Sequence, residues 1–510
     1  PYRVAPYEKG EMKKRLGPSM KYAREKFIFV YQDVRGKFMS EGEFRNMRPH
    51  RSRKLDKDKD IDESTDTFDT IKWLMRNVKR HNGKVGMWGT SYPGFYTIAG
   101  SIDAHPSLVA VSPQAPIADW FFDDFHHHGA FFLPHTFNFM SFFDQPKQGL
   151  TQTWPPRFDH GTPDGYSFFK EMGPLRNSTS VYLGDSLDFW NAVMEHPNYD
   201  SFWNARNILP HLRTIKPAVL TVGGWFDAED LYGPLNIYKA VEENSPRKYN
   251  GLVMGPWVHG GWSRTDGRTL GDIQFGDKST SDFYLNNIEF PFFMHHLKGT
   301  ADPKLAEAYM FQTGANRWRT FGDWPPKDRF MRKLYFHANK GLGFMENPNF
   351  RDEYAEFVSD PDNPVPYTKK ITTGMAKTYM VEDQRFAASR PDVIYFQTEP
   401  LKRDITIAGP ITANLFVSTS ASSADWVVKL IDVYPPDHPP YPHQPDKPMG
   451  EYQQMVRSEV IRGRFRDSYS EPKPFEPFEV AELNLPLQDV LHTFKKGHRI
   501  MVQVQSTWFP

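Results

Sequence analysis

The chain has 510 residues, which suggests about three domains, and its 62 basic and 62 acidic side chains give a formal net charge of zero. A balanced charge argues against a broad nucleic-acid-binding face, and no apolar run approaches the ~20 residues of a membrane-spanning helix. The sequence contains no cysteine, so disulfides, thiolate metal sites and a cysteine nucleophile are excluded.

The first hundred residues alternate between strand and helix patterns. Residues 27–36 (FIFVYQDVRG) form a short apolar run rich in aromatics, which is typical of a buried parallel strand. Residues 64–77 carry apolar side chains at helical spacing and predict an amphipathic helix. Residues 84–105 predict a strand, a sharp turn and a second helix. This alternation is the signature of a doubly wound α/β sheet.

The texture of the sequence then changes twice. Aromatic, His, Pro and Asn residues crowd together from about 119 to 213, with helical periodicity in patches, and predict an inserted helical cap. The alternation of strand and loop returns at 216–230 and 247–261, and beyond about 305 short alternating runs separated by Pro- and Gly-rich turns predict a β-sandwich or jelly roll. We therefore expect an α/β-hydrolase type of core over 1–118 and 214–304, a cap over 119–213 and a jelly roll over 305–510.

The hexapeptide GTSYPG (89–94) predicts a serine nucleophile at Ser91. An acyl-transfer enzyme presents its serine on a tight strand-to-helix turn, where N–H groups face the developing oxyanion. Gly89 and Gly94 let backbones approach closely, and Pro93 suits a first helical turn. The second glycine comes one residue later than in the strict G-x-S-x-G pattern. On the hexapeptide alone, a serine in an ordinary Gly-Pro turn is an equally good interpretation.

Two later residues supply the partners that Ser91 needs. In α/β-hydrolases the serine, the acid and the histidine follow in this order, with the last two on loops after later strands. Asp227 follows the strand-like AVLTVGGWF and His259 follows GLVMGPWV, so both are expected where a parallel strand ends. We expect His259 to take the Ser91 proton and Asp227 to orient the imidazole. The alternative, a core histidine bonded to backbone, does not account for this order and placement.

These segments together resemble a known family. GTSYPG, GGWFDAED, GPWVHGG, YQDVRGKFMSEGEF and the C-terminal β region are similar to the α-amino acid ester hydrolases, within the cocaine-esterase and X-prolyl dipeptidyl-peptidase group of serine hydrolases. The similarity covers nearly the whole chain and implies a hydrolase core, a helical cap and a jelly roll. It also implies an oxyanion hole made by the Tyr2 hydroxyl and the backbone N–H of Tyr92. Tyr7 also follows a proline and is a second candidate for the hydroxyl.

The resemblance implies a substrate with a free α-amino group. Amino acid ester hydrolases bind the α-ammonium of the acyl donor with three carboxylates, and Asp124, Glu229 and Asp230 match these positions. The last two lie close behind Asp227, so they must line the same pocket mouth, and three neighbouring acids repel one another unless a cation joins them. In the alternative interpretation, Glu229 and Asp230 favour the N-terminus of a following helix and Asp124 is solvated.

The expected function is therefore a serine hydrolase or acyltransferase acting on small molecules. It would cleave α-amino acid esters and related amides through an acyl-enzyme, then pass the acyl group to water or to an amine acceptor such as an amino acid or a β-lactam nucleus. Two alternatives stay open: a general esterase or X-prolyl dipeptidyl-peptidase of the same group, and a non-catalytic protein that binds a carbohydrate or a partner through the jelly roll.

The sequence predicts no metal, no other cofactor, and no nucleic-acid or membrane partner. The consecutive His126, His127 and His128 invite a metal site, but adjacent side chains point in different directions and rarely share one ion, so we interpret them as cap residues near the pocket. The resemblance further implies a periplasmic or secreted homo-oligomer.

Overall fold

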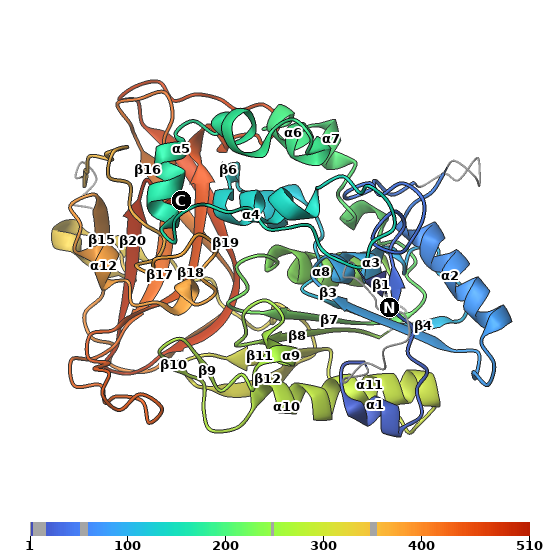
Figure 1. Ribbon diagram of the computed structural model, residues 1–510. Coiled ribbons are helices and arrows are strands. Elements are labelled where there is room, and N and C mark those ends of the chain that lie inside the picture. The colour runs from blue at the N-terminus through green and yellow to red at the C-terminus, as the bar shows by residue number, and fades with distance from the viewer. Residues whose placement is uncertain (1, 4–16, 52–59, 246–248, 347–353) are drawn as a thin grey trace.

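The computed structural model describes the backbone of residues 2–3 and the residues 17–51, 60–245, 249–346 and 354–510. Figure 1 shows an α/β core, a helical cap along its upper side and a C-terminal β domain beside both. None of the helices in the described ranges combines the length and the apolar composition that a membrane span requires.

The core is built on a six-stranded sheet. Its strands are β3 (Val85–Thr90), β4 (Leu108–Gln114), β7 (Ala218–Gly224), β8 (Asn250–Gly255), β11 (Ala308–Gln312) and β12 (Arg317–Phe321). The spatial order is β12-β11-β8-β7-β4-β3, and all neighbours are parallel except β11 and β12. All seven residues of β7 are buried, which is expected where helices cover both faces of a parallel sheet.

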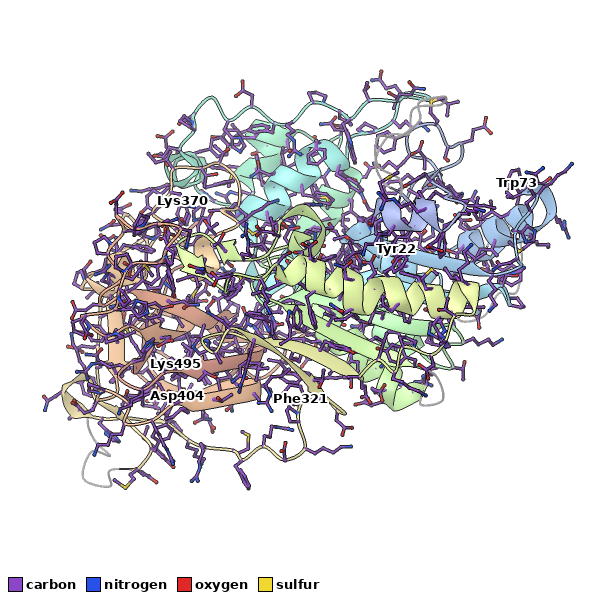
Figure 2. All side chains as sticks on the ribbon, turned by 90° about the horizontal axis from the view of Figure 1, so that it is seen from below. Tyr22, Trp73, Phe321, Lys370, Asp404 and Lys495 are labelled. Atoms are coloured by element: carbon purple, nitrogen blue, oxygen red, sulfur yellow. The ribbon has the colours of Figure 1, made fainter. Side chains whose placement is uncertain are left out.

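Helices cover both faces of this sheet. They are α1 (Met20–Arg24), α2 (Glu63–Asn77), α3 (Tyr92–Ala99), α8 (Tyr232–Asn244), α10 (Thr280–Tyr284) and α11 (Phe290–Phe293). Apolar side chains of α2, α3 and α8 share one buried cluster with the sheet, and those of α1, α10 and α11 share another. In Figure 2 Tyr22 of α1 lies inside the molecule, whereas Trp73 of α2 lies at its edge and is 60% exposed. The predicted doubly wound core is confirmed.

The local predictions for the core agree with the structure except at one place. The helix over 64–77 and the strand, turn and helix over 84–105 are confirmed. The strand predicted over 27–36 is wrong for most of its length: within the described residues only β2 (Gln32–Asp33) is a strand, and it pairs with β1 (Tyr2–Arg3). Beyond residue 304, β11 and β12 continue the core sheet to Phe321. Their short alternating runs have the same pattern as strands of the β domain.

The inserted segment is a mostly helical cap, as expected. It contains α4 (Leu133–Phe143), α5 (Gly165–Met172), α6 (Asp188–Glu195), α7 (Ser201–Asn204), the π-helical turns η1 (Phe121–Phe125) and η2 (Ser178–Leu183), and the short strands β5 (His126–His127) and β6 (Ala130–Phe131). Trp190 and Trp203 are fully buried within it, and most of its Phe side chains are buried or nearly so. The aromatic residues of this segment therefore mainly pack the cap.

The C-terminal domain is an antiparallel β-sandwich, in agreement with the prediction. One sheet has the order β15 (Val393–Gln397), β20 (Arg499–Gln505), β17 (Asp425–Val433) and β18 (Gln453–Arg462), and the other pairs β16 (Ile405–Val417) with β19 (Ala481–Phe494). Leu415 and Leu483 of the second sheet pack with Val428 and Ile461 of the first in a shared apolar core. The short elements between core and sandwich are β9 (Thr269–Leu270), β10 (Ile273–Gln274), β13 (Tyr335–Phe336), β14 (Leu342–Gly343) and α12 (Arg385–Ala388).

Strand β18 ties the β domain to the cap and to the core. Glu459 accepts a hydrogen bond from His127 Nδ1 at 2.9 Å, and Arg457, which is 1% exposed, donates to the Trp225 carbonyl in the loop after β7 at 2.8 Å. Burial would raise the pKa of Glu459, but the charge and the hydrogen bond of His127 outweigh it and hold the pKa at about 2. Glu459 is therefore charged throughout the neutral range.

Glu459→Gln should lower the free energy of unfolding by about 3 kcal/mol at pH 7, because it removes one partner of a buried ion pair. Since the folded pKa lies below the ordinary value for glutamate, the loss should be present at neutral pH and should shrink as the pH falls from about 4.3 towards 2. Urea unfolding of both proteins over this pH range measures it. Glu482→Gln, at an exposed position of β19, is the matched control and should stay within about 0.5 kcal/mol of the parent. Equal losses for the two variants would contradict the pairing.

Candidate active site

Ser91 lies on a strained turn between β3 and α3. Its backbone angles are φ 69° and ψ −133°, a region that costs a residue with a side chain about 1–3 kcal/mol. The turn is held in place because the Ser91 N–H donates to the carbonyls of Gln114 and Ala115, at 3.0 and 3.1 Å, at the end of the neighbouring strand β4. Strain that is kept by surrounding hydrogen bonds is typical of a functional position, and here it presents the hydroxyl at a helix N-terminus.

The two glycines of GTSYPG explain the unusual spacing of the motif. A Cβ on Gly89 would lie 2.3 Å from the Pro93 carbonyl oxygen, and a Cβ on Gly94 would lie 2.6 Å from the Gln114 carbonyl oxygen. The second close approach to a neighbouring strand therefore falls at position 94, three residues after Ser91. The first turn of α3 follows directly, so the geometry of a nucleophile turn is kept with the shifted glycine.

Tyr92 can contribute only its backbone to this site. It is the first residue of α3, where a helix N–H lacks an intrahelical acceptor and can face an oxyanion. Its side chain is 4% exposed, and its hydroxyl accepts a hydrogen bond from the Met47 N–H at 2.7 Å. The other residue expected at the oxyanion hole, Tyr2, pairs in parallel with Gln32 through its backbone, but its side chain lies outside the described part of the chain, as does Tyr7.

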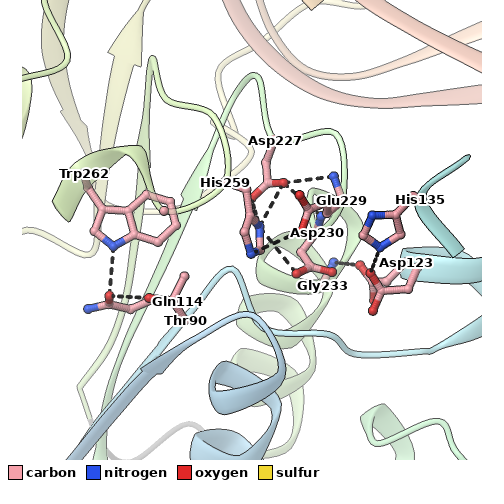
Figure 3. Close-up of polar contacts among 12 residues, drawn as sticks. Thr90, Gln114, Asp123, His135, Asp227, Glu229, Asp230, Gly233, His259 and Trp262 are labelled. Carbon is pink, nitrogen blue, oxygen red and sulfur yellow. Dashed lines mark hydrogen bonds and ion pairs between the residues drawn. The ribbon is translucent and has the colours of Figure 1, made fainter. Parts of the chain in front are cut away.

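Asp227 and His259 come from loops at the carboxyl ends of β7 and β8. The two strands are neighbours, and their loops are joined by hydrogen bonds from the N–H groups of Trp225 and Phe226 to the Gly255 and Trp257 carbonyls, at 2.8 and 3.0 Å. The same two loops bring His259 Nδ1 within 2.9 Å of Asp227 Oδ2 (Figure 3). The order of the residues in the sequence thus corresponds to a contact in space.

Asp227 is built to remain a carboxylate. It is 1% exposed, and its Oδ1 accepts the N–H groups of Glu229 and Asp230 at 3.0 and 3.1 Å. Burial would raise its pKa, but the charge and hydrogen bond of His259 and these two N–H groups lower it below its usual value. A permanently charged Asp227 fixes the His259 tautomer and favours its protonated form.

The far nitrogen of His259 faces a second acid. His259 Nε2 lies 3.4 Å from Glu229 Oε2, and in the described part of the structure no hydrogen bond joins the Ser91 hydroxyl to His259. Figure 3 shows the imidazole between the Asp227 and Glu229 carboxylates, with Asp230 beside them. Burial would lower the pKa of His259, but the charges of Asp227 and Glu229 raise it to about 9.

Asp124, Glu229 and Asp230 converge on this spot. Asp230 is fully buried, and neither of its carboxylate oxygens has a hydrogen-bond partner within the described ranges. Its pKa is raised well above the usual value, first by burial and then by the charges of Asp124 and other acids. Asp124 is 9% exposed and accepts a hydrogen bond from His135 Nε2 at 3.2 Å. The arrangement can hold a cation, because a positive charge would relieve both the burial and the repulsion.

The alternative interpretation of these acids does not fit the contacts. Asp123, and not Glu229 or Asp230, meets the start of α8, where it accepts the Gly233 N–H at 2.8 Å. Asp124 is buried in the turn η1 and is not solvated. Within the described residues, the side chains of Glu229 and Asp230 therefore accept no hydrogen bond from the first turn of α8.

Several residues of the site were not found from the sequence. His135 lies in the first turn of the cap helix α4, where its ring stacks between those of Phe132 and Phe139. No local sequence pattern indicates its contact with Asp124. Gln114 connects the turn of Ser91 to the loop of His259. Its carbonyl accepts the Ser91 N–H, and its side chain accepts a hydrogen bond from Trp262 Nε1 at 2.8 Å (Figure 3). The β domain adds a wall: a small cavity next to Asp227 and Glu229 is also lined by Glu459, Tyr379 and Trp508.

The three consecutive histidines differ in their surroundings, although His127 and His128 both lie near Glu459, at 2.9 and 4.0 Å. They lie on and after strand β5 and not on a helix, and successive side chains of a strand also point to opposite faces. The ring of His126 stacks on that of Phe121, with the ring centroids 4.3 Å apart. His127 pairs with Glu459, and His128 Nδ1 contacts the Val460 carbonyl. They hold the cap against the β domain beside the pocket.

Comparisons with known proteins cover the same two parts of the chain. The sequence-family model of the X-Pro dipeptidyl-peptidase (S15 family) matches residues 1–261. The family model of the X-Pro dipeptidyl-peptidase C-terminal non-catalytic domain matches residues 300–510. Cocaine esterase of Rhodococcus sp. (strain MB1 Bresler) is 26% identical over 96% of this chain and 82% of its own length.

Two solved structures resemble the whole fold. An α-amino acid ester hydrolase labelled with selenomethionine superposes with a TM-score of 0.90 at 33% identity, covering 100% of this chain and 84% of its own. An aminopeptidase from the marine sediment archaeon Thaumarchaeota archaeon gives a TM-score of 0.87 at 39% identity, covering 96% of this chain and 79% of its own.

The strain at Ser91 predicts that two variants lacking the hydroxyl differ in their free energy of unfolding. Ser91→Ala and Ser91→Gly both remove the hydroxyl and should both lose turnover. Because only glycine adopts φ 69° without strain, Ser91→Gly should be more stable than Ser91→Ala by about 1 kcal/mol, after allowance for the greater entropy of unfolded glycine. Urea unfolding of the two variants measures the difference, and an alanine variant as stable as the glycine variant would argue against a strained turn.

Proposed function

Because the chain belongs to the X-Pro dipeptidyl-peptidase (S15) family and is a serine hydrolase, we propose that it acts on α-amino acid esters and related amides through an acyl-enzyme on Ser91. The observation that carries this proposal is the buried cluster of Asp124, Glu229 and Asp230 beside His259, in which Asp230 has no hydrogen-bond partner among the described residues. Such a cluster suits a substrate that brings its own positive charge.

The proposed reaction has two steps. Ser91 Oγ attacks the carbonyl carbon of the donor while His259 Nε2 takes its proton, and the resulting oxyanion is bound by the Tyr92 N–H and, by the family resemblance, by the Tyr2 hydroxyl. The bond to the alcohol or amine then breaks, and His259 returns the proton to the leaving group. Water or an amine next attacks the acyl-enzyme, again through His259, and restores Ser91.

The carboxylate cluster would place the acyl donor for this attack. A primary ammonium offers three N–H donors, which matches three carboxylates converging on one point. The cluster lies at the end of the loop that carries Asp227, so an ammonium held there places the adjacent carbonyl next to the machinery of that loop. A donor with a blocked amine would leave buried charges without a counter-charge, which is costly.

Aminopeptidase activity is a second candidate, favoured by the same observation. The N-terminal ammonium of a peptide has the chemistry of the α-ammonium of an amino acid ester, and a solved structure with 39% identity bears the name aminopeptidase. The two activities differ only in the leaving group, an alcohol or an amine. Transfer to an amine acceptor, a homo-oligomeric state and a periplasmic or secreted location stay predictions from the resemblance.

The cluster predicts a strong preference for a free amine. The methyl ester of an aromatic amino acid should be hydrolysed with a kcat/KM at least ~100-fold higher than its N-acetylated form, which corresponds to about 3 kcal/mol for burying unpaired charge. Asp230→Asn should narrow this ratio, because it removes a carboxyl group that a bound ammonium would help to ionise, and it does not alter Ser91. Steady-state kinetics on the two esters measure both effects. Equal rates on the two esters would remove the role proposed for the cluster.

A further inference from the structure

In the structure, both ring nitrogens of His259 face carboxylates. Asp227 holds Nδ1 at 2.9 Å, and Glu229 lies 3.4 Å from Nε2. A general base must have a free lone pair on the nitrogen that receives the proton, and for His259 that nitrogen is Nε2. With Glu229 in this position, Nε2 is stabilised as a donor to Glu229 and not as an acceptor from Ser91.

The groups around the ring strengthen this state. Asp227, Glu229 and Asp230 face His259 from the loop after β7, and Asp124 acts on it from the cap turn η1. Two cap histidines face the cluster: His135 of α4 contacts Asp124 at 3.2 Å, and His127 of β5 is held by Glu459 and also feels the charge of Asp124. Asp227 and Glu229 each contact one ring nitrogen of His259, and both stabilise the protonated ring.

We infer that Glu229 holds His259 Nε2 in the free enzyme and that the ammonium of the acyl donor draws Glu229 away, so that binding of the donor releases the general base towards Ser91. The inference rests on the proposed function, since it needs an ammonium in the cluster of Asp124, Glu229 and Asp230. It assigns Glu229 a second task at the same site: the residue recognises the donor and also makes the reaction conditional on that recognition.

The size of the effect follows from the protonation of His259. A base with a pKa of about 9 is neutral in only about 1% of molecules at pH 7. An added positive charge next to Glu229 lowers the proton affinity of the ring, so releasing the base can raise the rate of attack by up to ~100-fold. The ammonium should therefore raise kcat as well as lower KM.

A probe without an amine separates release of the base from binding of the donor. A small neutral alkyl fluorophosphonate forms a bond between Ser91 Oγ and phosphorus and expels fluoride, while His259 takes the serine proton. At pH 7, propylammonium chloride should accelerate this labelling by ~10-fold or more, with saturation, because the ammonium fills the cluster. Sodium chloride at equal ionic strength and neutral 1-propanol should leave the labelling rate unchanged. Propylammonium that slows labelling or has no effect would overturn the inference.

Variants test whether Glu229 is the residue responsible. Glu229→Gln should label rapidly without amine and gain little from propylammonium, and the acid limb of its labelling rate should move below pH 9, towards the ordinary histidine value. Asp124→Asn should still respond to propylammonium, because Asp124 does not contact His259. It should need a higher concentration, because the cluster that binds the ammonium has lost one carboxylate. Glu171→Gln, at an exposed position of the cap helix α5, is the matched control and should respond like the parent. A Glu229→Gln variant that keeps the full amine response would contradict the role of Glu229.

The outcome also separates this inference from the proposed function. If labelling ignores propylammonium while the free-amine ester is still preferred, with the preference entirely in KM, the release of His259 is wrong and the proposed function stands. If the free-amine and N-acetylated esters react equally and propylammonium has no effect, both fail. Circular dichroism and urea unfolding of each variant show that the measured rates belong to folded protein.

Discussion

The contact between Asp227 and His259 depends on β7 and β8 lying side by side in a parallel sheet. Parallel neighbours end at the same edge, so two loops far apart in the sequence emerge together, and backbone hydrogen bonds between them fix their spacing. The same edge carries Ser91 at the end of β3 and Gln114 at the end of β4. The remaining groups of the site are arranged around this edge, either on the acid loop itself or on the cap and the β domain that cover it.

Burial gives this site its particular electrostatics. Asp123, Asp227 and Asp230 are each at most 1% exposed, and each meets a different need. Asp123 is satisfied by backbone N–H groups, Asp227 by His259 and two N–H groups, and Asp230 by no hydrogen bond within the described residues. A buried acid without a hydrogen bond, next to other acids and 3.6 Å from His259 Nδ1, is a source of instability unless a further cation joins it. Asp230 is therefore the buried acid of the three whose carboxylate oxygens make no hydrogen bond within the described residues.

The sequence allowed the parts of the site that sit on one regular pattern to be predicted. Ser91, Asp227 and His259 follow strands of the core, where the order of strand and loop determines which side chains reach the shared edge. Of the predicted strand over 27–36 only Gln32–Asp33 is paired within the described residues, and apolar composition alone does not determine how far a strand extends. His135 could not be predicted, because folding within the cap brings it to Asp124, and Glu459 could not, because packing of the β domain against the cap brings it to His127.

Arg457 joins the two matched regions of the chain. Its guanidinium reaches from the β domain to the carbonyl of Trp225, two residues before Asp227, and it is almost completely enclosed. A domain described for its relatives as non-catalytic is therefore anchored to the loop that orients the imidazole. Any change in how the β domain packs at this anchor would therefore reach the acid loop through a single hydrogen bond.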